Sequence, residues 1–248
     1  MIHVEELYKR YGDQQVLNGV TFDIRTGSVT TLMGLSGSGK SVLMRHMIGL
    51  EKPDRGAILV DGENIVGMKP KQLNRIRRRF GVLFQEGALF DSLSVRENVA
   101  FPIREHRDLS ETTIQEIVVE KLTNVGMREH QEKFPAELSG GMRKRVGLAR
   151  ALALEPEIVF FDEPTTGLDP ITKSAIYRLI EQTHSESSIT YVLVSHDVQG
   201  VLEVSDEIML LFDGRIAARG SPSEIRDSLD PAVKQFMTGS SDGPLSIE

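Results

Sequence analysis

The strongest chemical signal in the chain is a glycine-rich segment that ends in a lysine and a serine, Gly34-Leu-Ser36-Gly37-Ser-Gly39-Lys40-Ser41. It fits the spacing G-x-x-x-x-G-K-[ST], follows an apolar run and precedes a helix-forming run. Glycines let backbone N–H groups surround phosphate oxygens, and the positive end of a following helix favours the anion. We therefore expect a nucleotide phosphate site, in which Lys40 reaches the β- and γ-phosphates and Ser41 binds Mg²⁺.

Two adjacent carboxylates, Asp162 and Glu163, close the apolar run 158–161. A strand buried on both faces does not place carboxylates at its end without a cation, a partner or water. Asp162 suits a Mg²⁺ ligand, direct or through water, and Glu163 suits a group that orients or deprotonates an attacking water. The alternative is two solvated residues at a strand end, and the phosphate loop favours the catalytic interpretation.

A third segment, Leu138-Ser139-Gly140-Gly141-Met142, opens a helical run at 143–152. Ser139 can cap that helix, and the two glycines let backbone N–H groups meet a phosphate without help from a lysine. With this segment the chain resembles the ABC ATPase family, whose signature is usually LSGGQ. Met142 departs from that pattern, so a contact made by the glutamine side chain is lost while backbone contacts remain.

The resemblance covers almost the whole chain and implies further roles. In this family the signature of one subunit serves ATP held by the facing subunit, so it implies a dimer with a second copy of the chain. Tyr11 matches the aromatic residue that stacks on adenine, Gln85 the glutamine that touches Mg²⁺ and the attacking water, and His196 the histidine that contacts the γ-phosphate. Asp169 matches the loop that crosses the dimer interface. The implied ATP-binding residues are Tyr11, Gly34, Ser36, Gly37, Gly39, Lys40, Ser41, Ser139, Gly140, Gly141 and Asp169, the implied catalytic residues are Glu163, His196 and Gln85, and the implied Mg²⁺ ligands are Ser41, Gln85 and Asp162.

The elements that must position these residues indicate an α/β fold. Asp61-Gly62 and Asp213-Gly214 predict antiparallel hairpin turns, and Ser94, Asp169, Ser221 and Asp230 predict helix starts. Short apolar or β-branched runs, typical of buried parallel strands, occur at 20–24, 29–33, 57–60, 80–84, 158–161, 190–194 and 207–212. The fold class implied by the resemblance is a P-loop NTPase ABC ATPase core with an antiparallel β subdomain. We expect an ATPase domain over 1–238, a helical subdomain inserted at about 86–153, and a flexible C-terminal tail at 239–248.

Composition limits the function classes. The net charge is −7, from 29 basic and 36 acidic residues, which disfavours a nucleic-acid partner. The chain contains 0 cysteines, which excludes disulfides and cysteine-ligated zinc. There is no secretory signal and no run of about 18 apolar residues, so other chains would have to supply any membrane spans.

Three segments, 83–90, 97–106 and 138–150, resemble the Mla/Mce-type ATPases, a branch that moves phospholipids or other hydrophobic molecules between bacterial inner and outer membranes. Methionine at the fifth signature position is typical of that branch. The resemblance implies a permease of the MlaE type, an MCE-domain lipid-binding protein, sometimes a STAS-domain subunit, and a peripheral location on the cytoplasmic face of the inner membrane.

Several alternatives remain open at this point. The same catalytic residues serve the ATPase of a small-solute importer, and a non-transport ABC subunit of the cell-division type also carries a single set of motifs. Apolar residues within 87–101 either line a groove for a permease coupling helix or pack inside the helical subdomain. A basic cluster is either a solvated helix face or a contact for acidic permease loops or anionic lipid headgroups. Its members are Lys71, Arg75, Arg77, Arg78 and Arg79.

Overall fold

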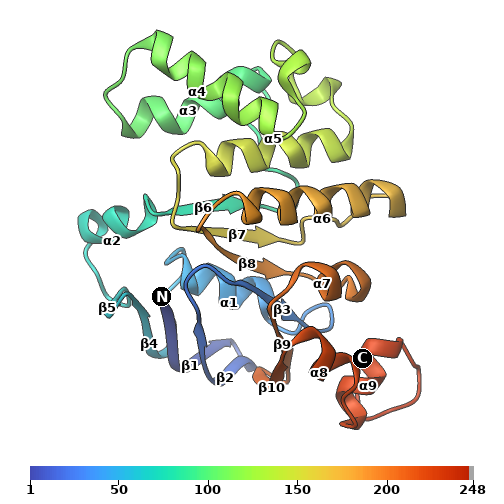
Figure 1. Ribbon diagram of the computed structural model, residues 1–248. Helices are drawn as coiled ribbons and strands as arrows, with labels where there is room; N and C mark the ends of the chain where they lie inside the picture. The colour runs from blue at the N-terminus through green and yellow to red at the C-terminus, as the bar shows by residue number, and fades with distance from the viewer. Residues whose placement is uncertain (246–248) are drawn as a thin grey trace. The chain divides into compact units, whose positions relative to one another are not determined.

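The structure is a computed structural model that describes residues 1–245. Figure 1 shows its helices and strands. The described residues form two compact units, the first comprising residues 1–73 and 192–245 and the second residues 74–191. Helix α2 (Pro70–Arg77) and strand β8 (Thr190–Val194) each run across a boundary between the units.

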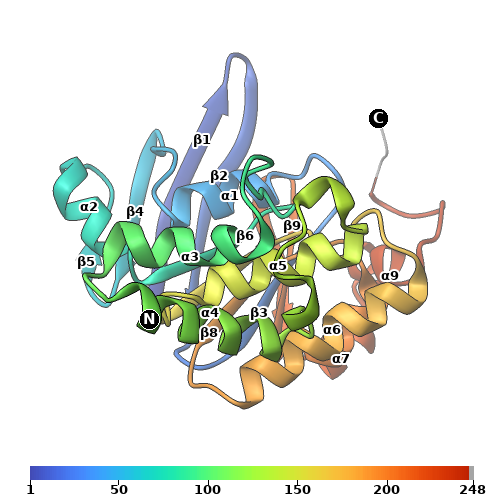
Figure 2. The same cartoon turned by 90° about the horizontal axis from the view of Figure 1, so that it is seen from above.

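An antiparallel sheet in the first unit forms the expected β subdomain. Its strands are β1 (Ile2–Tyr11), β2 (Gln14–Ile24), β4 (Arg55–Val60) and β5 (Glu63–Asn64), in the order β2-β1-β4-β5. Figure 2 shows β1 and β2 as a long hairpin. The predicted turn at Asp61-Gly62 joins β4 to β5, and both residues have a positive φ, of 48° and 82°, as a tight hairpin turn of this kind requires.

Strand β1 is the longest of the strands that lie outside the predicted apolar runs. Its pairing with β2 shifts register between Val4 and Leu7 and twice more before Tyr11, and Glu6 has a φ of 46°. Each bulge adds a residue to one strand and so breaks the alternation of inward and outward side chains. The strand therefore carries buried residues at irregular spacing and no continuous apolar run.

A second group of strands in the first unit supports the phosphate loop. Strand β3 (Val29–Met33) pairs in parallel with β9 (Glu207–Phe212), and β9 pairs in antiparallel fashion with β10 (Arg215–Gly220) through the predicted turn at Asp213-Gly214. Helices α7 (Val198–Val204), α8 (Pro222–Arg226) and α9 (Pro231–Thr238) share a buried core with these strands. The core residues are Met33, Val201, Ile208, Leu210, Ile225 and Val233. This core holds β3 in place immediately before the glycine-rich segment.

The second unit combines two parallel strands with helices. Strand β6 (Phe80–Leu83) pairs with β7 (Ile158–Asp162), in a register that runs from Phe80 opposite Ile158 to Leu83 opposite Phe161. Helices α3 (Val95–His106) and α4 (Glu111–Asn124) lie side by side (Figure 1) and both contact α5 (Gly140–Leu152). Helix α6 (Pro170–Ser185) and two 3-10 turns, Arg128–His130 and Pro135–Glu137, complete the unit. That residues 86–153 form a separate inserted subdomain stays a prediction.

The four helix starts predicted from capping residues are confirmed. The side chains of Ser94, Asp169, Ser221 and Asp230 each accept hydrogen bonds from backbone N–H groups in the first turn of the helix that follows. Such caps satisfy donors that have no partner inside the helix. Asp169 therefore has a structural task in addition to the interface role that the resemblance implies.

Leu245, near the C-terminus, contacts helix α9. The backbone N–H of Leu245 donates to Oε1 of Gln235 at 2.7 Å, and Nε2 of Gln235 donates to the Leu245 carbonyl at 3.1 Å. Residues 246–248 of the expected tail 239–248 lie outside the described residues. Within residues 1–245, no helix has both the length and the apolar character needed to cross a bilayer.

Candidate functional site

The phosphate loop lies between the fully buried strand β3 and helix α1 (Lys40–Met47), which is the context that its motif requires. Gly39 has a φ of 97°, and a Cβ there would lie 2.9 Å from Cγ1 of Val16, so only glycine fits. Helix α1 begins after Gly39 with no side-chain cap. Its first backbone N–H groups are therefore not used by a capping side chain, which suits an anion.

Hydrogen bonds hold the side chain of Lys40 against the glycine-rich segment. Lys40 is buried, and its Nζ donates to the carbonyls of Gly34 and Leu35, both at 2.8 Å. These hydrogen bonds help to satisfy the buried ammonium group, which lies at the glycine-rich segment. The arrangement can bind a multiply charged anion such as a nucleotide triphosphate.

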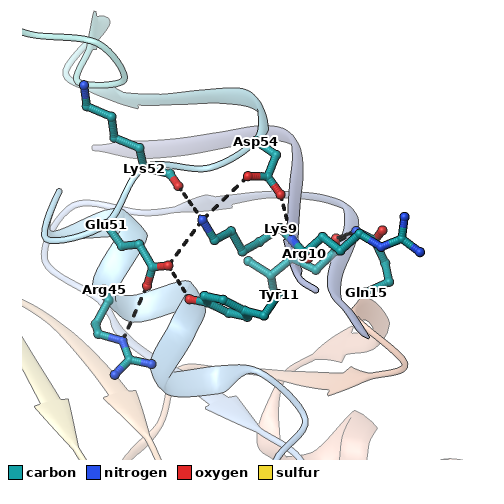
Figure 3. Close-up of polar contacts among 9 residues, drawn as sticks. Lys9, Arg10, Tyr11, Gln15, Arg45, Glu51, Lys52 and Asp54 are labelled. Atoms are coloured by element: carbon teal, nitrogen blue, oxygen red, sulfur yellow. Dashed lines mark hydrogen bonds and ion pairs between the residues drawn. The ribbon is translucent and has the colours of Figure 1, made fainter. Parts of the chain in front are cut away.

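Tyr11, at the end of β1, is 43% exposed and is fixed by a polar cluster (Figure 3). Its hydroxyl donates to the carboxylate of Glu51. Lys9 Nζ lies 3.3 Å from Glu51 Oε1, 3.6 Å from Asp54 Oδ1 and 5.1 Å from the centre of the Tyr11 ring. Partial burial and the hydrogen bond to Glu51 raise the pKa of Tyr11 to about 12, so the hydroxyl stays protonated and the ring is held by its tip.

A buried histidine lies in the helix that follows the phosphate loop. His46 is 1% exposed, and neither ring nitrogen has a hydrogen-bond partner among the described residues. Burial lowers the pKa of His46 from 6.5 to about 4, although Glu51 acts in the opposite direction. The ring is therefore neutral in the folded protein near pH 7.

His46 should make stability depend on pH. Because its pKa is lower in the folded state than in the unfolded state, its contribution is complete above pH 6.5 and is lost as the pH falls towards 4. We expect this group to account for about 2 kcal/mol of stability lost between pH 7 and pH 5. Denaturant unfolding at the two pH values measures the loss. His46→Leu should lose about 2 kcal/mol less than the wild-type protein, whereas His106→Leu, which changes an exposed histidine, should behave as wild type; equal losses in all three proteins would contradict the assignment.

The two predicted carboxylates lie at the carboxyl end of β7 in the second unit. Asp162 is the last residue of the strand, and Glu163 follows with a φ of 50°. Positive φ is rare outside glycine and is concentrated at functional sites. Oε2 of Glu163 accepts a hydrogen bond from the hydroxyl of Thr166 at 3.0 Å. Glu163 is thus placed by an unusual backbone conformation and by a neighbouring side chain.

Gln85 and Glu163 lie at the ends of adjacent parallel strands of the second unit. Because β6 and β7 are paired in parallel, the residues that follow them emerge at the same edge. A residue that the motif search missed joins them: Lys144, in α5, donates from Nζ to the backbone carbonyls of Gln85 and Glu163. No local signal in the sequence marks it, because Lys144 stands between Arg143 and Arg145. Its burial among small and apolar residues of α5 is evident only in the structure.

The signature segment begins α5 as expected. The hydroxyl of Ser139 accepts a hydrogen bond from the backbone N–H of Met142 at 3.3 Å. A Cβ on Gly141 would lie 2.6 Å from Cγ2 of Thr172, so the start of α5 packs closely on the first turn of α6. Asp169 caps that turn, accepting from Thr172 N at 3.0 Å and Thr172 Oγ1 at 2.6 Å, and these bonds lower its pKa. The signature and the loop at 167–169 are therefore mechanically connected.

His196 lies in the first unit, after β8. The backbone N–H of Ser195 donates to the carbonyl of Leu32 at 3.1 Å, which places the end of β8 beside the strand that leads into the phosphate loop. His196 itself is exposed. The first unit thus holds Tyr11, the phosphate loop and His196, and the second unit holds Gln85, Ser139, Gly140, Gly141, Asp162, Glu163 and Asp169.

Comparison with curated proteins gives relatives over nearly the whole chain. A probable ribonucleotide transport ATP-binding protein of Mycobacterium leprae is 44% identical over 99% of this chain and 71% of its own length. The intermembrane phospholipid transport system ATP-binding proteins MlaF of Haemophilus influenzae and Escherichia coli K12 are 42% and 43% identical. They match 100% and 94% of this chain and 94% and 87% of their own lengths.

Solved structures and a family model agree with these relatives. A dimeric bacterial ABC transporter cassette is 31% identical and superposes with a TM-score of 0.83 over 90% of this chain and 99% of its own. An ATP-binding cassette solved as a dimer in a post-hydrolysis state with ADP and Pi is 30% identical, with a TM-score of 0.82 over the same shares, 90% and 99%. The ABC transporter family model matches residues 17–166. With its phosphate loop, signature segment and strand-end carboxylates, the chain belongs to the ABC transporter family and is one of its ATP-binding, ATP-hydrolysing cassettes.

Proposed function

We propose that this chain powers a bacterial transporter that moves phospholipids or other hydrophobic lipids between the inner and outer membranes. The observation that carries the proposal is the similarity to two MlaF phospholipid transport ATPases, which extends over 94% or more of this chain and most of their own lengths. The names of these two relatives do not favour the small-solute and cell-division hypotheses. The ribonucleotide transport named for the Mycobacterium leprae relative is the rival cargo, but this chain spans a smaller share, 71%, of that protein.

ATP would be bound and hydrolysed by the predicted residues in named roles. Lys40 and the start of α1 bind the phosphates, Tyr11 stacks on adenine, and His196 contacts the γ-phosphate. Glu163 orients the attacking water and accepts its proton, with Gln85 beside it. Ser41, Gln85 and Asp162 would hold Mg²⁺. Their hydroxyl, amide and carboxylate oxygens fit a small hard cation, which binds few protein ligands and keeps water and phosphate oxygens; the ion would neutralise phosphate charge.

The working unit would be a dimer of two copies. Each chain has one phosphate loop and one signature segment, and the related cassettes were solved as dimers. Ser139, Gly140 and Gly141 would bind ATP held by the facing copy, with Asp169 in the crossing loop. ATP would then hold the copies together until hydrolysis removes the γ-phosphate contacts, as in other nucleotide switches.

A groove of about 530 Å³ in the second unit supports a membrane permease partner. Its lining is mainly apolar, and Phe90 and Phe101, which are 45% and 39% exposed, have ring centres 4.8 Å apart. Arg77, Arg78 and Arg150 are cationic members of the lining. An apolar groove with cationic side chains suits an amphipathic helix that carries acidic residues. We assign it to a coupling helix of an MlaE-type permease.

The two hypotheses for segment 87–101 concern different residues. Phe90 and Phe101 line the groove, whereas Val95 and Val99 are fully buried. Asn98 is also buried, and its side chain bonds the backbone of Phe90 in both directions and the carbonyls of Leu93 and Ser94. This network holds the loop that carries Phe90, so the groove is preformed.

Charge placed in the groove should release the permease. We expect Phe90→Asp combined with Phe101→Asp to reduce co-purification with the membrane fraction at least about tenfold, because charged groups would be buried against an apolar helix face. ATP hydrolysis by the isolated variant should persist. Phe134→Asp changes an equally exposed phenylalanine, at 45%, outside the groove lining, and should co-purify normally. If only Phe134→Asp lost co-purification, the permease would bind a surface near Phe134 and not the groove.

The lipid cargo is tested on the complete complex. The chain is purified with its native membrane partners, and bound small molecules and proteins are identified by mass spectrometry. We expect bound phospholipid, a permease of the MlaE type and an MCE-domain protein, with a STAS-domain subunit as a further component, and we expect the chain at the cytoplasmic face of the inner membrane. Bound ribonucleotide other than ATP or ADP, or a complex without lipid and without an MCE-domain protein, would overturn the lipid assignment.

If Tyr11 stacks on adenine, the polar cluster around it in Figure 3 should affect the affinity for ATP. Tyr11→Ala should raise the KM for ATP by roughly tenfold, since stacking of a base on an aromatic ring is worth about 1–3 kcal/mol. Glu51→Ala should raise it by roughly threefold, because the ring loses the hydrogen bond that holds it. Tyr11→Phe keeps the ring and should match Glu51→Ala, and combining these two changes should add nothing further. Full additivity would show that Glu51 acts independently of Tyr11.

A further inference from the structure

Lys144 is a buried lysine to which none of the sequence motifs assigns a role. It is 4% exposed in the middle of α5, among Val146, Gly147 and Leu148, which are also buried. Burying an ammonium group is costly unless hydrogen bonds satisfy it. Its Nζ donates to the carbonyl of Gln85 and, at 3.3 Å, to the carbonyl of Glu163. The Lys144 side chain therefore donates to the backbone carbonyls of two residues that we predict to act in ATP hydrolysis.

The two carbonyls belong to the points where parallel strands β6 and β7 end. Gln85 begins the loop after β6, and Glu163 occupies a left-handed conformation directly after β7. Neither residue lies in regular secondary structure, so the ladder hydrogen bonds do not set their spacing. Lys144 connects the two residues, because its Nζ donates to the backbone carbonyls of both Gln85 and Glu163.

Helix α5 fastens the same loop at a second point. Arg150, two turns after Lys144, donates from its guanidinium to the carbonyls of Gly87 and Ala88 at 2.8 and 2.7 Å. Gln85, Gly87 and Ala88 are thus all attached to one rigid helix. That helix begins at the signature serine, one turn before Lys144.

Burial lowers the pKa of Lys144, and the carboxylates of Glu86, Asp162 and Glu163 act in the opposite direction. A side chain of the same length without donors would remove the hydrogen bonds that Lys144 makes to both backbone carbonyls.

The geometry points to Lys144 as a positioning residue for ATP hydrolysis, which holds the backbones of Gln85 and Glu163 at the spacing that the attacking water requires. This inference rests on the proposed roles of Gln85 and Glu163. Lys144 does not contact the nucleotide in this role; it acts through the two residues that it joins. Its loss should therefore change turnover and leave nucleotide affinity nearly intact.

The test compares kcat and KM for ATP in the full-length chain. Lys144→Met keeps the length of the side chain and removes all donors, and kcat should fall roughly 100-fold, because a small displacement of catalytic groups has an effect of that order. KM should change less than about threefold, since Lys40 and Tyr11 are untouched. Lys144→Gln retains amide donors and should recover part of the loss. Lys121→Met is the matched control: this lysine is also largely buried, with 14% of its side chain exposed, and it pairs with Glu120.

The outcomes separate this inference from the proposed function. A folded Lys144→Met variant with wild-type kcat, or one that raises KM as much as it lowers kcat/KM, would overturn the positioning role. If Lys144→Met does not fold, Lys144→Gln decides, since a kcat at least about fivefold below wild type with unchanged KM supports the role and a wild-type kcat overturns it. Glu163→Gln is measured alongside. Normal turnover in Glu163→Gln would refute the role of Glu163 itself, whereas an inactive Glu163→Gln beside a fully active Lys144→Met would refute only the inference about Lys144.

Discussion

Glu163→Gln should bind ATP with near wild-type affinity and lose turnover by roughly 10²–10⁴-fold, the range for removal of a general base. The amide keeps the size of the side chain and can still accept the hydrogen bond from Thr166, so the left-handed backbone at this position should be preserved. A glutamine cannot take the proton of the attacking water. Bound ATP should therefore persist and hold two copies together.

The measurements are ATPase rate, ATP affinity and mass by light scattering with and without ATP. The variant should be dimeric in ATP and monomeric or weakly associated without nucleotide. Glu181→Gln is the matched control, because the same change is made on an exposed position of α6, and it should hydrolyse ATP normally. If Glu163→Gln turns over ATP at the wild-type rate, another group must accept the proton.

Strands buried on both faces were predictable from the sequence to within a residue. Runs 29–33, 190–194 and 207–212 coincide with β3, β8 and β9, because a strand with no solvent-facing side reads as one uninterrupted apolar run. The half-exposed strand β1 was not predictable in this way. Its bulges shift the register, so the pattern depends on pairing with β2 and β4 rather than on the local sequence.

In the candidate site, too, features encoded by neighbouring residues could be predicted, whereas contacts between residues far apart in the sequence could not. The phosphate loop and the helix caps are encoded within a few consecutive residues, because backbone conformation and capping are local properties. Lys144 and Gln85 are 59 positions apart, and Tyr11 and Glu51 are 40 apart. Contacts over such separations are set by the packing of whole elements, and neither pair has a motif spacing that a reader of one sequence could recognise.

The distant contacts also change how the local motifs are understood. Ser139 uses its hydroxyl to cap α5. Asp169 caps α6 with Oδ1, and its Oδ2 accepts a hydrogen bond from the hydroxyl of Thr172. Both residues therefore have a structural role at a helix start, apart from the interface role that we propose for them. A substitution at either position would alter helix geometry as well as an interface contact, so its effect alone would not identify the interface role.

Lys40→Ala should weaken ATP binding itself by roughly 100-fold. In the proposed site the ammonium group contacts the phosphates, and hydrogen bonds to charged groups are worth about 1.5–3 kcal/mol each. The same Nζ also donates to the carbonyls of Gly34 and Leu35. The measurement is the Kd for ATP by calorimetry or by a fluorescent analogue.

The loop could also loosen when Lys40 is removed, since its two carbonyl contacts go with it. Thermal unfolding of the same variant separates the two effects, because a loosened loop lowers Tm without nucleotide, whereas a lost phosphate contact removes only the rise in Tm that ATP produces. Lys234→Ala removes an exposed lysine of the same unit and should leave both values at the wild-type level. An unchanged Kd in Lys40→Ala would show that the backbone N–H groups of the glycine-rich loop and the start of α1 bind the phosphates without the lysine, and it would remove Lys40 from the site.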